Sequence, residues 1–148
     1  MTWSKGLESL SELKVNPMSD FELSVIAKQR LLTCDTRLQI IVNAAAKRIH
    51  FQVLCGHRGE KEQNDAFERG MSKLRWPQSR HNSNPSQAVD LAPLPIDWHN
   101  TDRFKTLAMI VMDEASKAGV KLRWGGDFNM NSLPDDKFVD LPHYELHE

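Results

Sequence analysis

The chain has 148 residues, a formal net charge of -1 and a hydrophobic fraction of 40%. This length suits one compact domain with its own core, and the near-neutral charge excludes a general electrostatic attraction to nucleic acid or to an anionic membrane. No stretch of about 18 apolar residues is present, so we expect no membrane insertion.

The two cysteines and the N-terminus bear on the compartment. Cys34 and Cys55 form no CxxC pair, and reduced thiols are expected of both. The N-terminus, MTWSKGLESL, carries charge where the apolar core of a signal peptide would lie. We therefore predict no signal peptide and synthesis in the cytosol. The basic stretch 73–80 is interpreted as a solvated loop.

The first half of the chain is predicted to be mainly helical. Leucines at helical spacing in residues 3–15 are interrupted by glycine, and Asn16-Pro17 ends the pattern. Ser19 or Asp20, and then Asp35 or Thr36, are candidate helix caps. The elements expected here are a helix over 20–32, a helix over roughly 36–49, a strand over 50–54, a turn at 56–59 and a short helix over 61–69.

The second half of the chain supplies most of the predicted sheet. Its elements are a long irregular loop over 70–86, a strand over 88–92, a polar connection over 93–100, a helix over 102–118 capped by Asp102 and ended by Gly119, a strand over 122–124 with a turn at 125–126, a loop over 129–137 and a strand over 144–146. Together the elements predict an α+β fold, a single domain in which helices pack on a small antiparallel sheet.

Three residues beside predicted strand ends are candidate metal ligands. His81, Asp90 and His143 would supply two imidazole nitrogens and one carboxylate oxygen, which is a typical catalytic zinc set with a position left for water. Asp140 precedes His143 by three residues and could act as a general base and acid beside the metal.

Each candidate also has a purely structural interpretation. His81 could be a surface histidine, Asp90 a strand-edge cap or salt-bridge partner, and His143 a half-buried histidine with satisfied hydrogen bonds. The spacing by itself leaves these alternatives open. The remaining histidines have weaker claims as ligands; they are His50, His57, His99 and His147.

Four separated motifs carry a resemblance to a known family. Ser79-Arg80-His81 followed by Ala88-Val89-Asp90 resembles the SxH…AxD signature of the zinc D-Ala-D-Ala peptidase superfamily, and the stretch DLPHYEL at 140–146 resembles its second signature. The stretch VLCGHR at 53–58, with a later Gln63, resembles the V-x-x-G-x-R segment. The stretch WGGDF at 124–128 resembles a segment of phage members. The similarity is greatest to L-alanyl-D-glutamate peptidases that serve as bacteriophage endolysins.

The resemblance implies a fold, a cofactor and a set of site residues. It implies a hedgehog/DD-peptidase-like fold and one catalytic Zn²⁺ ion bound by His81, Asp90 and His143. Asp140 would be the catalytic base and acid, and Arg58 would contact substrate and stabilise the oxyanion. Two further positions, Gln63 and Ser79, match supporting or substrate-binding residues.

The sequence departs from the superfamily pattern at three places. His81 and Asp90 lie nine residues apart, a longer spacing than the superfamily pattern has. Asp140 occupies a position where cell-wall carboxypeptidases have glutamate, which favours the endolysin branch. His57 replaces a more usual aromatic residue before Arg58, and nothing in the sequence explains it.

The resemblance covers residues 28–148, which we interpret as the peptidase domain, whereas residues 1–27 are expected to be an extra helix or an extension. The expected function is zinc-dependent cleavage of the L-alanyl-D-glutamate bond in the peptidoglycan stem peptide. Two alternatives are a D-Ala-D-Ala carboxypeptidase or dipeptidase, and a non-catalytic zinc-stabilised wall-binding module.

The resemblance also implies a cellular setting. The enzyme is expected to be a monomer that stays in the host cytoplasm until lysis. A holin-type pore would then release it to the cell wall in the periplasm. Neither nucleic acid nor membrane insertion is expected to take part.

Overall fold

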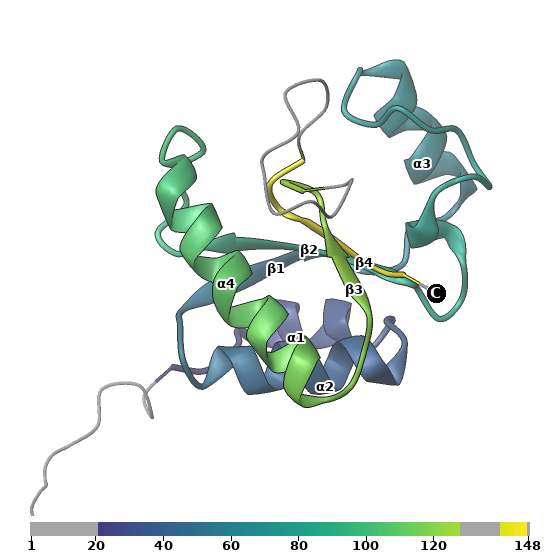
Figure 1. Ribbon diagram of the computed structural model, residues 1–148. Coiled ribbons are helices and arrows are strands. Elements are labelled where there is room, and N and C mark those ends of the chain that lie inside the picture. Colours follow the sequence, from purple (N-terminus) through teal and green to yellow (C-terminus); the bar gives the residue numbers. More distant parts are fainter. Residues whose placement is uncertain (1–20, 128–139, 148) are drawn as a thin grey trace, which may run out of the picture.

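A computed structural model describes residues 21–127 and 140–147 (Figure 1). The expectations for residues 3–15 and 129–137 lie outside these residues. In chain order the elements are α1 (Val25–Leu31), α2 (Thr36–Ala46), β1 (Phe51–Cys55), α3 (Glu60–Glu68), the 3₁₀ helix η2 (Arg80–Asn82), β2 (Ala88–Pro93), α4 (Thr101–Lys117), β3 (Leu122–Trp124) and β4 (His143–Leu146).

The four strands form one antiparallel sheet in the order β1-β2-β4-β3. Helix α1 packs on β1, α4 packs on β2 and β3, and α2 packs against α4. Figure 1 shows α3 standing apart from these helices, beyond the other side of the sheet. The expected α+β architecture is therefore confirmed, with β4 inserted between two strands that precede it in sequence.

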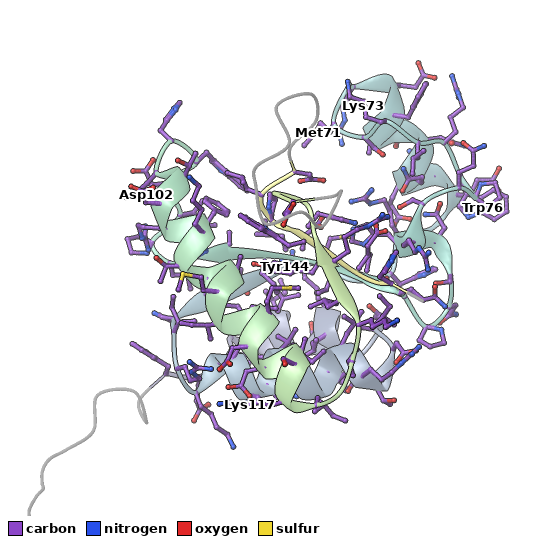
Figure 2. The ribbon with its side chains drawn as sticks, in the orientation of Figure 1. Met71, Lys73, Trp76, Asp102, Lys117 and Tyr144 are labelled. Atoms are coloured by element: carbon purple, nitrogen blue, oxygen red, sulfur yellow. The ribbon has the colours of Figure 1, made fainter. Side chains whose placement is uncertain are left out.

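The two faces of the sheet have different chemistry because successive side chains in a strand point to opposite sides. Val89, Leu91 and Tyr144 belong to the buried core on the helix side. Tyr144 lies in the middle of the molecule, whereas Trp76 lies at its outer edge (Figure 2). Asp90 and His143 alternate with the core residues and so point to the opposite face.

A β-bulge changes the facing of the last residue of β1. Phe51 pairs with Pro93 and Val53 with Leu91, but Cys55 pairs with Asp90, so the register shifts between Val53 and Cys55. Simple alternation would put Cys55 on the core side with Val53. The extra residue instead turns Cys55 to the face that carries Asp90.

Three helices differ most from the predictions: α1 in its start, α4 in its capping residue and α2 in its end. Helix α1 begins only at Val25, because the Ser24 hydroxyl accepts a hydrogen bond from the Ala27 amide and caps it. Asn100, not Asp102, caps α4 by accepting from the Arg103 amide. Helix α2 is capped by Asp35 as expected but ends at Ala46, earlier than predicted.

Other expectations agree with the structure. Both cysteines are free thiols, with Cys34 buried and Cys55 half-buried. Gly119 follows α4 with φ +72, a left-handed conformation that suits glycine at a helix end. Among the described residues, no helix combines the length and apolarity that crossing a membrane requires.

Candidate metal centre

The three predicted ligands meet at one carboxylate oxygen. Asp90 Oδ1 lies 3.2 Å from His81 Nε2 and 3.1 Å from His143 Nδ1. The two histidine rings are edge to face with centroids 5.1 Å apart. The antiparallel pairing of Asp90 with His143 in β2 and β4 sets one contact, and η2 brings His81 from the preceding loop. The structure therefore brings together residues that are up to 62 positions apart.

The second nitrogen of each histidine ring is also held. His81 Nδ1 lies 2.7 Å from the Gly56 carbonyl oxygen, and His143 Nε2 lies 2.7 Å from Glu145 Oε1. An acceptor at one ring nitrogen fixes the neutral tautomer and leaves the other nitrogen free to bind a metal. Each ring thus presents its remaining nitrogen toward Asp90.

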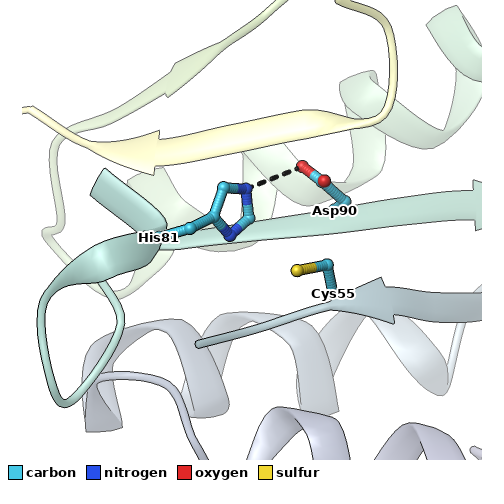
Figure 3. Close-up of side chains that lie close together, drawn as sticks. All are labelled: Cys55, His81 and Asp90. Carbon is cyan, nitrogen blue, oxygen red and sulfur yellow. Dashed lines mark hydrogen bonds and ion pairs between the residues drawn. The ribbon is translucent and has the colours of Figure 1, made fainter. Parts of the chain in front are cut away.

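Cys55 joins this group, although no sequence motif indicates it. Its Sγ and the ligand atoms of His81 and Asp90 all lie within 4.8 Å of one another, so these three side chains could hold one metal ion. Figure 3 shows the three side chains directed toward one another from β1, η2 and β2. The signal that sequence reasoning missed is the β-bulge, which reverses the facing of Cys55.

Charges around Asp90 favour a cation at this place. Burial disfavours charge on both histidines, yet Asp90 raises the pKa of His81 to about 10, and hydrogen bonds to Asp90 and Glu145 raise the pKa of His143 to about 9. Burial likewise disfavours the Asp90 carboxylate, but the two imidazoles hold its pKa well below the usual range. The pocket therefore stabilises positive charge beside a buried carboxylate.

Arg58 and Gln63 form one hydrogen-bonded unit beside the candidate ligands. Arg58 Nη2 lies 3.6 Å from Asp90 Oδ2, and its Nη1 donates to Gln63 Oε1 at 3.0 Å. Gln63 is fully buried and its amide donates to the Leu74 carbonyl at 2.6 Å and the Ser72 hydroxyl at 2.9 Å. The buried amide thus ties the guanidinium to the loop after α3. A contact of Gln63 with substrate stays a prediction.

Ser79 supports His81 through the backbone. Its hydroxyl accepts a hydrogen bond from the His81 amide at 3.1 Å and caps η2. The Asn82 side chain completes this turn by accepting from the Ser79 amide at 3.0 Å. Ser79 therefore shapes the turn that aims His81, and its role toward substrate stays a prediction.

Asp140 is held by the turn after β3. Its amide donates to the Gly125 carbonyl at 2.9 Å, and its carbonyl accepts from the His143 amide at 3.1 Å. The Trp124 indole donates to the Leu141 carbonyl at 2.7 Å. Burial raises the pKa of the Asp140 carboxyl, and the nearby Asp90 charge raises it further. A carboxyl with a raised pKa suits a group that both accepts and returns a proton.

The donor set fits Zn²⁺. Two imidazole nitrogens and a carboxylate oxygen are ligands that zinc accepts in catalytic sites, and both imidazoles have the outer hydrogen-bond partners that such ligands need. A cation there would replace the protons that Asp90 now favours on the two rings. The same arrangement places one arginine and one carboxyl with a raised pKa near the ligands, which is a set suited to hydrolysis.

Comparisons with known proteins identify a family and a similar fold. The sequence profile of a family described as phage L-alanyl-D-glutamate peptidase matches residues 18–147. The crystal structure of the Serratia marcescens L-Ala D-Glu endopeptidase ChiX has a similar fold, with a TM-score of 0.71 and 22% sequence identity over 90% of this chain and 96% of that one. No curated protein matches the sequence. The profile begins within residues 1–27, and the boundary expected at residue 28 stays a prediction.

Proposed function

The chain belongs to the phage L-alanyl-D-glutamate peptidase family, and on that premise we propose that it hydrolyses the L-alanyl-D-glutamate bond of peptidoglycan stem peptides with one Zn²⁺ ion. The observation that carries the proposal is the convergence of His81 and His143 on a single oxygen of Asp90. Both rings are already oriented by acceptors on their far sides. The site is therefore preorganised for a cation.

In this proposal His81 Nε2, Asp90 Oδ1 and His143 Nδ1 hold the zinc ion. When bound, zinc polarises the scissile carbonyl and makes water more acidic. The Asp140 carboxylate accepts a proton from the attacking water and then transfers it to the nitrogen of the departing D-glutamate. The raised pKa of Asp140 supports this double role, because the group must release the proton it has taken.

Arg58 is proposed to stabilise the negative charge that develops on the carbonyl oxygen. Its guanidinium is only partly exposed, with a side-chain exposure of 18%, and Gln63 fixes one of its nitrogens. A donor that is already oriented loses little entropy when the transition state forms. Arg58 also lies beside Asp90, so it is close to the metal ligands.

We place this activity in host-cell lysis by a bacteriophage, with a holin-type pore as the route from cytoplasm to cell wall and a monomeric enzyme. The family description supports the phage setting. If the proposal holds, cells that express the protein lyse only when the inner membrane is permeabilised. Lysis of intact cells without a permeabilising agent would contradict the need for a pore.

The test of the proposed reaction is the release of amino groups from purified peptidoglycan. The wild type should release N-terminal D-glutamate, and a chelator should abolish the release until Zn²⁺ is added. Asp140→Asn keeps the size of the side chain but cannot accept the proton, so we expect the rate to fall about 10²–10⁴-fold. The variant should still bind zinc, because Asp140 is not one of the proposed ligands.

The products separate the alternatives. Release of free D-alanine from the wall in place of N-terminal D-glutamate would identify a D-Ala-D-Ala carboxypeptidase. Hydrolysis of the free dipeptide D-alanyl-D-alanine to two D-alanines, without any product from the wall, would identify a dipeptidase. Binding of zinc and of the wall without any new amino group would indicate a wall-binding module. Asp97→Asn is a suitable control, since Asp97 is exposed and lies in the connection between β2 and α4.

A further inference from the structure

We propose that Cys55, His81 and Asp90 form a second, sulfur-containing metal set that overlaps the peptidase set, and that a soft divalent ion such as Cd²⁺ occupies it. The inference deepens the proposed function, because it assigns a competing occupant to the same centre. It rests on the placement of Cys55, which no motif in the sequence indicates.

The geometry is set by the sheet. The β-bulge in β1 pairs Cys55 directly with Asp90, so that the thiol and the carboxylate project from neighbouring strands on the same face. The ligand atoms of Cys55, His81 and Asp90 all lie within 4.8 Å of one another. Figure 3 shows the thiol on the β1 side of the His81 ring.

The two cysteines have different surroundings. Cys55 Sγ donates to the carbonyl of the adjacent residue Gly56 at 3.5 Å and lies within 4.8 Å of the candidate ligand atoms of His81 and Asp90. Cys34, in contrast, is buried in the core and directs its thiol to the Ala88 carbonyl at 3.8 Å. Cys55 is therefore the cysteine that is placed for metal binding, and Cys34 is a matched control within the same chain.

The softness of the metal ion decides which of the two overlapping ligand sets binds it. Thiolate ligands select soft ions, whereas imidazole and carboxylate ligands suit the borderline Zn²⁺ ion. When Cd²⁺ binds, a cadmium–sulfur bond replaces the sulfur–hydrogen bond and the thiol proton passes to solvent. Since both sets use His81 and Asp90, the two metals exclude each other, and Cd²⁺ occupancy removes the ligands that the peptidase needs.

Ultraviolet difference spectroscopy of the full chain tests the proposal. One equivalent of Cd²⁺ added to the metal-free wild type should produce the sulfur-to-cadmium charge-transfer band. The band should persist in Cys34→Ser and disappear in Cys55→Ser. A wild type without the band, or a band that survives in Cys55→Ser, would overturn the proposal.

Affinities give a second, quantitative test. Cys55→Ser should weaken Cd²⁺ binding at least about tenfold, since even outer partners of metal ligands are worth 10–100-fold. The Zn²⁺ affinity should stay close to that of the wild type. An equal loss for both metals would mean that Cys55 belongs to the zinc set, which contradicts two overlapping sets.

A measurement on the wild type keeps the proposal testable even if a cysteine variant fails to fold. The ¹¹³Cd resonance of the wild type should lie in the range of cadmium with a sulfur ligand, and a shift typical of nitrogen and oxygen ligands alone would refute the proposal. These readouts need no peptidase activity. Cadmium–sulfur bonding without wall hydrolysis would therefore contradict only the proposed function.

Discussion

Glu145 connects the candidate metal centre to two arginines. Its Oε1 accepts from His143 Nε2 at 2.7 Å, and its other oxygen pairs with Arg123 and lies 3.8 Å from Arg80. Burial opposes the charge of this carboxylate, but His143 and Arg123 lower its pKa to about 2. Glu145 therefore stays ionised, and it fixes the tautomer in which His143 Nδ1 faces Asp90.

The predicted effect of Glu145→Ala is a loss of zinc affinity of about 10–100-fold, because the His143 ring loses its outer acceptor. Glu145→Gln keeps an oxygen in place and should lose less. Competition with a chromophoric chelator measures both values. Glu68→Ala, which removes an exposed glutamate of α3, is the control. Unchanged affinity in Glu145→Ala would show that the ring needs no such support.

The turn after β3 positions Asp140, the proposed general base. Gly125 accepts a hydrogen bond from the Asp140 amide and donates one to the His143 carbonyl. A Cβ at position 125 would overlap the Asp140 carbonyl oxygen. Glycine is therefore required here for a close approach of two backbone segments, which explains part of the WGGDF motif in physical terms.

We expect Gly125→Ala to displace Asp140 and to lower kcat/KM for wall hydrolysis on the order of 100-fold, as displacements of about 1 Å do. Gly70→Ala is the matched control. Gly70 has φ +74 and open space around its Cα, so alanine there should cost roughly 1–2 kcal/mol of backbone strain and leave kcat/KM unchanged. Equal activity of the two variants would refute the role of the turn.

Helix α2 depends on its N-cap. The Asp35 carboxylate accepts hydrogen bonds from the Arg37 amide at 2.9 Å and from the Arg37 guanidinium at 3.0 Å. The bond from the guanidinium is the main cause of the lowered pKa of Asp35. The folded pKa is thus below the unfolded one. The resulting stability is complete above the unfolded pKa and is lost as the pH falls through the folded pKa.

Asp35→Ala should lower the free energy of unfolding by about 1 kcal/mol at neutral pH. The difference from the wild type should shrink in acid, where the carboxylate of the wild type is protonated. Urea titrations at several pH values measure it. Asp35→Asn retains an acceptor for the Arg37 amide but lacks the charge, so its deficit should be smaller than that of Asp35→Ala and should disappear in acid. A deficit for Asp35→Ala that is constant into acid would exclude a contribution from the charge.

Over the whole molecule, hydrophobic spacing was enough to predict the fold class and most elements. Leu38, Ile41 and Val42 repeat at helical spacing and are fully buried in α2. Cap positions were harder, because several polar residues precede each helix and tertiary contacts select one. Ser24, for example, also donates a hydrogen bond to the Gln52 side chain on β1.

The sequence pointed to the three proposed ligands, His81, Asp90 and His143, and to Ser79, but not to Glu145 or Cys55. Glu145 lies within a motif that was noticed for His143 and Asp140, and its contact with His143 depends on the alternation of β4. Cys55 depends on a bulge, and no periodic pattern predicts an inserted residue. Local patterns thus indicate candidate ligands, whereas the register of the sheet decides which side chains surround them.

Metal binding should contribute to the stability of the whole domain. An ion that binds only the folded state at about 100 times its dissociation constant adds about 2.7 kcal/mol. For a chain of this length that corresponds to a rise in Tm of roughly 5–11 °C. We therefore predict that removal of Zn²⁺ with a chelator lowers Tm by this amount in scanning calorimetry, and that added Zn²⁺ restores it.

The size of this increment should depend on pH. In the metal-free protein the pKa values of His81 and His143 are raised to about 10 and about 9, so both rings are largely protonated at neutral pH and zinc must displace those protons. The zinc-dependent rise in Tm should therefore be larger at pH 8 than at pH 6. His143→Ala should lose the rise, whereas His99→Ala, which alters an exposed histidine, should keep it. A rise that persists in His143→Ala would place the ion elsewhere, because a site without this ring lacks one of its three proposed donors.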